Sequence, residues 1–158
     1  MLLAACTRTT IDLSGEWQFS MGDVPEFTDR ITLPGSMLTN GKGYDVTVDT
    51  RWTGSTYDSS YYYSPHLARY REEGNVKYPF FLTPDKYYVG NAWYRRTVRV
   101  PSAWEGRPVT LYLERPHIET TLFVNGREVG HQMSLSTPHQ YDISEYVAYG
   151  DDNELVIC

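Results

Sequence analysis

The sequence predicts an all-β protein, a sandwich of short antiparallel strands. Short runs in which apolar and polar residues alternate recur along the chain, and most end at Gly, Pro or an Asn-Gly pair. No stretch has the 3.6-residue periodicity of a helix of ordinary length. Strands do not alternate with helical segments, which excludes a parallel α/β sheet and favours a sandwich. A length of 158 residues is typical of one domain.

The first three strands are predicted at residues 12–19, 30–33 and 93–100. The first carries apolar side chains at even spacing, the second stops at Pro34-Gly35, and the third stops at Pro101. Side chains alternate between the faces of a strand, so Arg96 is expected on the same face as its apolar neighbours. A cation in that position is expected to need a carboxylate partner.

The C-terminal third of the chain predicts further strands. Residues 109–113 alternate cleanly, and residues 120–129 contain Asn125-Gly126 between two apolar runs. Both positions of that dipeptide accept a positive φ, which makes it the strongest hairpin signal in the sequence. Residues 142–147 are expected to form one helical turn capped by Asp142 or Ser144. Residues 153–158 have the pattern of a last strand.

Residues 40–91 interrupt this pattern with a long irregular insertion. The segment is rich in Gly, Ser, Asp and Tyr and shows little periodicity. Irregular stretches of this length are functional loops or disordered. The aromatic content argues against disorder. We therefore expect an ordered excursion that packs against the sandwich or against a further domain.

The composition excludes several classes of partner and site. A net charge of −6 and a pI of about 5.1 argue against nucleic acid and against an anionic membrane surface. The two cysteines, Cys6 and Cys158, lie at opposite ends of the chain and form neither a disulfide framework nor a metal knuckle. The four histidines lack metal-ligand spacing, and no nucleotide-binding or hydrolase motif occurs. We expect no metal, no cofactor and no catalytic residue in this chain.

Both ends suggest processing or a longer protein. Residues 1–10 form an apolar start in which Leu3-Ala4-Ala5-Cys6 is similar to a bacterial lipobox, as in a truncated signal peptide. A lipidated Cys6 would anchor the protein in the periplasm or at the cell surface, whereas the alternative is a short tail with an inert cysteine. Residues 11–158 would form the domain, and its strand-like end is typical of the N-terminal part of something longer.

Several blocks of sequence coincide, in order, with one family. They are Leu13-Ser14-Gly15-Glu16-Trp17-Gln18-Phe19, Leu33-Pro34-Gly35-Ser36-Met37, Ala92-Trp93-Tyr94-Arg95-Arg96, the stretch from Val100 to Gly106, Leu113-Glu114-Arg115, Val124 to Gly130 and Leu135 to Ser144. Over about residues 11–157 the chain resembles the N-terminal sugar-binding domain of glycoside hydrolase family 2, the family of β-galactosidases and β-glucuronidases. The order and number of the blocks make this resemblance specific.

The resemblance implies a jelly-roll β-sandwich followed by an immunoglobulin-like domain and a TIM barrel. In such enzymes the barrel carries both catalytic Glu residues of a retaining mechanism. The chain would then be the non-catalytic, sugar-binding part of an exo-glycosidase acting on β-glycosides, and alone it should be inactive. Two alternatives remain open: a stand-alone lipid-anchored glycan-binding module, and a domain that only buttresses the barrel.

The resemblance also suggests substrate contacts. Asn75-Val76-Lys77-Tyr78-Pro79 matches a stretch of the β-galactosidase branch whose Asn reaches the sugar, so Asn75 and Tyr78 are candidates. The plainer interpretation is that Asn75 follows Gly74 in a turn. A second contact in that branch is an Asp, whose place falls at Met133-Ser134 here. This departure puts galactose specificity in doubt.

Aromatic and histidine side chains supply the remaining candidates. Trp52 and the Tyr61-Tyr62-Tyr63 run could stack on a sugar face, and packing between domains explains them equally well. His139 could hydrogen-bond a sugar or order its own loop. The other tryptophans, Trp17, Trp93 and Trp104, are expected to pack in the core or at its edge.

Overall fold

The computed structural model describes residues 9–46, 50, 60–75, 84 and 86–158. The chain divides into two units, of which one comprises residues 1–35 and 90–158 and the other residues 36–89. Each unit is treated by itself below. Among the described residues, no helix has both the length and the apolar character needed to cross a bilayer.

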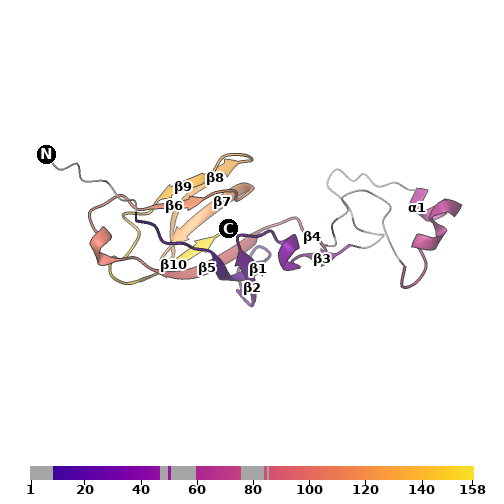
Figure 1. Ribbon diagram of the computed structural model, residues 1–158, viewed down its shortest axis with the longest axis horizontal. Coiled ribbons are helices and arrows are strands. Elements are labelled where there is room, and N and C mark those ends of the chain that lie inside the picture. The colour runs from indigo at the N-terminus through magenta and orange to yellow at the C-terminus, as the bar shows by residue number, and fades with distance from the viewer. Residues whose placement is uncertain (1–8, 47–49, 51–59, 76–83, 85) are drawn as a thin grey trace. The chain divides into compact units, whose positions relative to one another are not determined.

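The first unit is built on a six-stranded antiparallel sheet with the order β2-β1-β5-β10-β7-β8 (Figure 1). Its strands are β1 (Gly15–Met21), β2 (Asp29–Leu33), β5 (Ala92–Arg99), β7 (Ile118–Val124), β8 (Arg127–Ser134) and β10 (Asp152–Ile157). The alternation predicted from the sequence is visible in β1, where Trp17 and Phe19 are buried and Glu16 and Gln18 are exposed.

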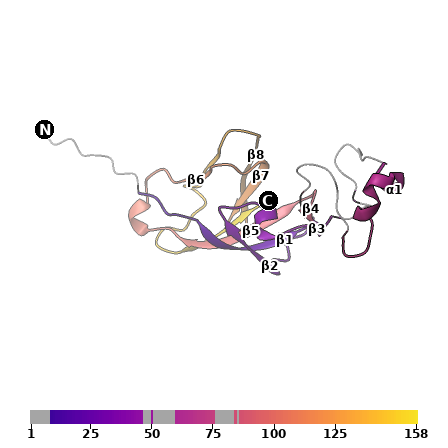
Figure 2. The same cartoon turned by 45° about the vertical axis from the view of Figure 1, so that its right-hand side comes forward.

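A second, smaller sheet pairs β6 (Thr110–Leu113) with β9 (His139–Asp142), and both strands are labelled in Figure 1. A 3₁₀ turn, η3 (Ser102–Trp104), precedes β6 and is the salmon coil at the left of Figure 2. The apolar faces of the two sheets form the core. It contains Trp17, Phe19, Ile31, Val100, Val109, Leu111, Leu122, Val124, Tyr141, Ile143, Leu155 and Ile157. The prediction of an all-β sandwich is confirmed.

The strongest turn signal forms the expected hairpin. Asn125 and Gly126 join β7 to β8 with φ values of +52° and +76°, the left-handed backbone that this dipeptide tolerates. The strand β9 was not among the predicted strands. It has only four residues, and their alternation becomes informative only when β6 lies beside it.

The expected carboxylate partner of Arg96 is replaced by backbone carbonyls. One guanidinium nitrogen donates to Leu13 O (2.6 Å) and Ser14 O (2.9 Å), and the guanidinium lies 5.7 Å from the Trp17 ring centroid. Arg96 is half-buried, so part of its charge remains hydrated. Carbonyl dipoles and an aromatic face therefore accommodate this cation at the edge of the core.

The second unit holds only short elements among its described residues. They are η1 (Leu38–Asn40), β3 (Tyr44–Asp45), α1 (Ser60–Tyr63), η2 (Pro65–Tyr70) and β4 (Lys86–Tyr87). The strands β3 and β4 pair with each other, and Lys86 Nζ lies 2.5 Å from Asp45 Oδ1. The rings of Tyr44 and Tyr88 lie 6.0 Å apart.

Two Asp-x-Ser turns give the first unit a dependence on pH. The hydroxyl and backbone N–H of Ser14 donate to Asp12 Oδ1 (2.6 and 2.8 Å), and Ser144 does the same to Asp142 (2.6 and 3.0 Å). In each turn these hydrogen bonds, the side-chain bond first, lower the pKa of the carboxyl below its ordinary value.

The double variant Asp12→Asn/Asp142→Asn should flatten the acid limb of the stability curve. A folded-state pKa that is lowered gives stability above the unfolded pKa of about 4, and this stability is lost as the pH falls through the folded value. Urea unfolding between pH 7 and pH 2 measures the difference. We expect the wild-type protein to lose more stability on acidification than the variant, and parallel curves would contradict this.

Candidate functional site

The end of β8 and the connection that follows it form an ordered segment, residues 133–138, which is called the β8–β9 loop. It carries two of the predicted contact residues, Met133 and Ser134, which are the last two residues of β8. Ser134 Oγ accepts hydrogen bonds from the backbone N–H of Thr137 (3.1 Å) and from its hydroxyl (2.6 Å). Met133 and Leu135 flank Ser134 with 71% and 66% of their surface exposed. The loop therefore presents two apolar side chains to solvent around an anchored hydroxyl.

The base of this loop is closed by a pair of glutamines. Gln140 N–H donates to Gln132 Oε1 (3.1 Å), and Gln132 Nε2 donates back to Gln140 O. Because one amide side chain satisfies both backbone groups of Gln140, it ties β8 to β9 across the loop. The positions of Met133 and Ser134 are thus fixed from both sides.

His139, the first residue of β9, lies in the core with 1% exposure. Its Nδ1 lies 2.6 Å from Thr120 Oγ1, which in turn lies 2.7 Å from the hydroxyl of Tyr141. The Tyr141 hydroxyl donates to Thr120 O (2.8 Å). The His139 side chain is thus part of the packing beneath the loop and has no direct exposure to a ligand in this chain.

The hydrogen bonds among His139, Thr120 and Tyr141 are all formed in only one placement of their protons. The Tyr141 proton is used on Thr120 O, so the Thr120 hydroxyl must donate to Tyr141 and accept from His139. His139 therefore carries a proton on Nδ1. Its Nε2 is buried without a hydrogen-bond partner among the described residues.

Asn75 lies in the second unit, in the turn that follows η2. Its backbone N–H donates to Glu72 O (3.0 Å) and its Nδ2 donates to Arg69 O (2.6 Å). These bonds agree with the turn interpretation. In the described part of the chain its Oδ1 has no partner, so the acceptor half of the amide is open to a ligand.

Some of the other residues singled out in the sequence are described by the structure, and others are not. Trp52, Tyr78 and the lipidation candidate Cys6 lie outside the described residues. The three other tryptophans have packing roles: Trp17 is buried with Nε1 donating to Leu13 O, Trp93 donates to Gly22 O, and Trp104 lines a cavity.

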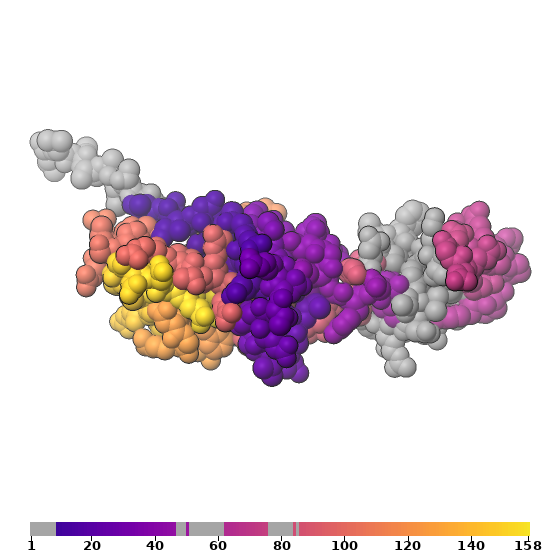
Figure 3. Space-filling view, turned by 90° about the horizontal axis from the view of Figure 1, so that it is seen from below, coloured from indigo at the N-terminus to yellow at the C-terminus, as the bar shows by residue number. Residues whose placement is uncertain are grey.

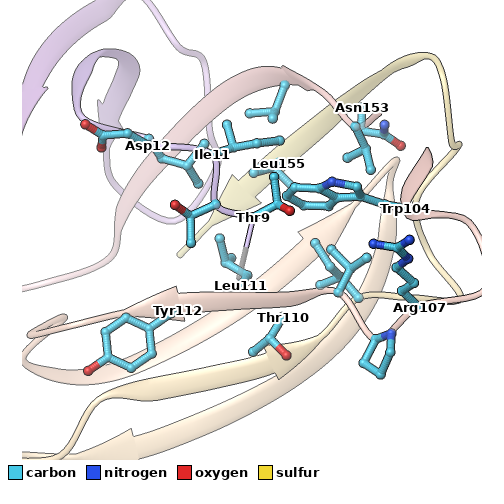
Figure 4. Close-up of a pocket in the computed structure, with 17 residues that line it drawn as sticks. Thr9, Ile11, Asp12, Trp104, Arg107, Thr110, Leu111, Tyr112, Asn153 and Leu155 are labelled. Atoms are coloured by element: carbon cyan, nitrogen blue, oxygen red, sulfur yellow. The ribbon is translucent and has the colours of Figure 1, made fainter. Parts of the chain in front are cut away.

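This cavity has a volume of about 880 Å³ and lies within the first unit (Figure 4). The segment from Thr9 to Leu13 forms one wall and β6 forms the opposite wall. Trp104 and Arg107 lie at one end. In Figure 3 this segment, in indigo, runs along the surface beside the salmon residues that precede β6. The cavity was not predicted, because it depends on how residues distant in the sequence meet.

The described residues contain no group of three or more His, Cys, Asp or Glu that could hold a metal ion. The exposed polar and apolar side chains of the β8–β9 loop and the open acceptor of Asn75 suit hydroxyl-rich ligands. Asp12 and Asp142 are the described carboxyl groups whose pKa departs from its ordinary value, and in both the pKa is lowered. A general acid needs a raised pKa, so these two carboxyls are not a pair of general acid and nucleophile.

Comparison with known proteins agrees with this fold. A β-galactosidase of Psychromonas ingrahamii is 27% identical over 147 residues, which is 92% of this chain and 13% of that protein. A β-glucuronidase from an uncultured Clostridium has a TM-score of 0.59 at 18% identity, over 99% of this chain and 23% of that chain. The β-D-glucuronidase of Dictyoglomus thermophilum has a TM-score of 0.52 at 22% identity, over 92% of this chain and 18% of that chain.

The two structural likenesses are evidence of the fold alone, and the chain spans about 13% of the length of the β-galactosidase that it matches. The family evidence comes from a sequence model. Residues 11–158 match the model for the sugar-binding domain of the family 2 glycosyl hydrolases, and the chain therefore belongs to that family.

Proposed function

We propose that this chain is the N-terminal, non-catalytic domain of a retaining exo-glycosidase that hydrolyses β-glycosidic bonds. In this proposal it helps to shape the substrate pocket of a TIM barrel, which carries both catalytic Glu residues and lies elsewhere in the full-length protein. The match of residues 11–158 to the family's sugar-binding domain is the observation that carries the proposal. The larger size of the related enzymes supports it.

The β8–β9 loop would meet the sugar with Met133 and Ser134. Ser134 Oγ already accepts two hydrogen bonds from Thr137, so its own proton remains to donate to a sugar oxygen. An aspartate in this place would only accept. We therefore propose that the loop favours a sugar that presents an acceptor here, with the Met133 thioether against its C–H face.

Asn75 is a separate candidate contact and would act as a hydrogen-bond acceptor. Its open Oδ1 can accept a hydrogen bond from a sugar hydroxyl, while its Nδ2 is held by Arg69 O. A side chain whose amide plane is fixed in this way loses little entropy on binding.

Asn75→Ala in the full-length enzyme should lower kcat/KM for aryl β-glycosides by about 10-fold, equivalent to about 1.4 kcal/mol. The reason is the loss of a sugar hydrogen bond that is formed in the transition state. Steady-state kinetics with an aryl β-galactoside and an aryl β-glucuronide measure it. Glu73→Ala, an exposed neighbour in the same turn, is the matched control and should leave kcat/KM unchanged. Unchanged kinetics of the Asn75 variant at native stability would contradict the proposed contact.

The alternative of a stand-alone, lipid-anchored glycan-binding module depends on Cys6, which lies outside the described residues. A reading frame that continues into a barrel with two catalytic Glu residues would favour the enzyme. A stop codon after Cys158 would favour the module.

A further inference from the structure

The two ends of the β8–β9 loop belong to different sheets. Within the part of the chain that the structure describes, β8 pairs only with β7 in the six-stranded sheet, and β9 pairs only with β6 in the two-stranded sheet. The strands on either side of the loop are therefore not joined by a ladder of backbone hydrogen bonds in these residues. Side chains must set the distance between the two ends of the loop.

The register turns one residue of β9 towards β8. Ile143 N–H donates to Val109 O (2.9 Å), and hydrogen-bonded pairs alternate with non-hydrogen-bonded pairs along an antiparallel ladder. Gln140, opposite Tyr112, is therefore in a non-hydrogen-bonded pair, and its backbone groups point away from β6. The carboxamide of Gln132 binds both of these groups, because it has the same donor and acceptor as a peptide group. This side chain thus takes the place of a neighbouring strand.

The residues on either side of Gln140 are held by Thr120. Thr120 lies opposite Gln132 in the β7–β8 ladder, so the two side chains share a face of the sheet. The Thr120 hydroxyl bonds to the side chains of His139 (2.6 Å) and Tyr141 (2.7 Å). One cross-strand pair therefore binds three consecutive residues of β9. Thr120 does so from the core and Gln132 from a half-buried position at its edge.

We propose that the Thr120–Gln132 pair positions the β8–β9 loop, and that Gln132 is a positioning residue for the reaction. Gln132 immediately precedes Met133 and Ser134, and the three residues that the pair binds follow Pro138 at the other end of the loop. With both ends held, the hydroxyl proton of Ser134 is kept where a sugar oxygen would receive it. The proposal rests on the proposed function, in which Ser134 contacts the sugar.

Gln132 is the half of the pair that can be removed without disturbing the core. Thr120 is 5% exposed, so the loss of its hydroxyl would leave the Nδ1 proton of His139 without an acceptor in the core. Gln132 lies at the half-buried edge, where water can replace its carboxamide on the backbone groups of Gln140. A Gln132 variant should therefore fold, and its effect on the loop can be measured separately from stability.

Hydrogen exchange in the full-length enzyme tests whether Gln132 holds the loop. Gln132→Met keeps the approximate length of the side chain and removes both hydrogen bonds to Gln140. Exchange of the Thr137 amide, which donates to Ser134 Oγ (3.1 Å), should become about 10-fold faster. Gln140→Ala is the matched control, because it removes an exposed side chain and keeps both backbone groups. Its Thr137 amide should exchange as in the wild-type enzyme.

A double-variant cycle tests whether Gln132 acts through Ser134. Gln132→Met and Ser134→Ala should each lower kcat/KM for aryl β-glycosides by about 10-fold, and the double variant should lose no more than either single variant. The reason is that the placement of the Ser134 hydroxyl no longer matters once the hydroxyl is absent. Gln132→Glu keeps the acceptor for Gln140 N–H and loses the donor, so its kcat/KM should lie between those of the wild-type enzyme and Gln132→Met.

Three outcomes would overturn the proposal, and they differ in what else they affect. Unchanged exchange of the Thr137 amide in Gln132→Met would mean that Gln132 does not hold the loop. Multiplied losses in the double variant, about 100-fold, would mean that Gln132 acts by a route other than Ser134. Both results leave the proposed function intact if Ser134→Ala is impaired. Unchanged kcat/KM in Ser134→Ala would instead remove the sugar contact of the proposed function, and the positioning role with it.

Discussion

Asn153→Leu is expected to lower the free energy of unfolding by about 3–5 kcal/mol, because it leaves several buried polar groups without partners. Asn153 is fully buried. Its Oδ1 accepts from Ala148 N–H (2.6 Å) and Asn125 Nδ2 (2.8 Å). Its Nδ2 donates to the carbonyls of Ala148 (2.9 Å) and Asp151 (3.0 Å). One amide thus joins the β7–β8 hairpin to the turn that precedes β10.

Urea unfolding of Asn153→Leu measures this effect. Asp152→Ala is the matched control, because its exposed side chain makes only a 3.8 Å ion pair with Arg99. That change should cost less than about 1 kcal/mol. A loss below about 1 kcal/mol for Asn153→Leu would mean that water replaces these hydrogen bonds, and the amide would then not be what joins the hairpin to the turn.

Trp17→Ala should also lower the free energy of unfolding by about 3–5 kcal/mol, because it empties a large volume in the core. Trp17 is 3% exposed and its Nε1 donates to Leu13 O (3.0 Å). Its ring also lies beside the Arg96 guanidinium, which binds the carbonyls of Leu13 and Ser14. The loss of the indole would therefore weaken the attachment of the N-terminal segment as well as the core.

Trp104→Ala in the same chain is the control for Trp17→Ala. Trp104 lines an open cavity and is half-buried, so its removal should cost about 1–2 kcal/mol. Denaturant titrations of both variants give the comparison. Similar losses would show that the two tryptophans contribute equally to the core, and this would contradict the difference in their burial.

Much of the sandwich could be predicted from local signals. Asn125-Gly126 encodes its turn through backbone preference alone. In β5 the predicted alternation is seen at the C-terminal end, where Val98 and Val100 are less exposed than Thr97 and Arg99. These signals act over a few residues, so they can be recognised in the sequence without knowledge of the partner strands.

The partners of polar side chains could not be predicted in the same way. Arg96 was expected to need a carboxylate, yet carbonyls of a segment more than 80 residues away satisfy it. His139 was a candidate sugar contact, yet it lies in the core, where Thr120 accepts its proton. Both outcomes depend on which strands lie face to face, and no local pattern encodes this.

The buried chain from His139 through Thr120 to Tyr141 has a direction, because each proton has one place. A ring of hydroxyls in water can reverse all its bonds together at little cost, but this chain ends on a carbonyl, which cannot donate. Reversal is therefore forbidden. A slip of β9 by two residues against β7 would move both the donor and the final acceptor out of reach at once. These hydrogen bonds thus fix the alignment of β9 with β7, and with it the position of the β8–β9 loop.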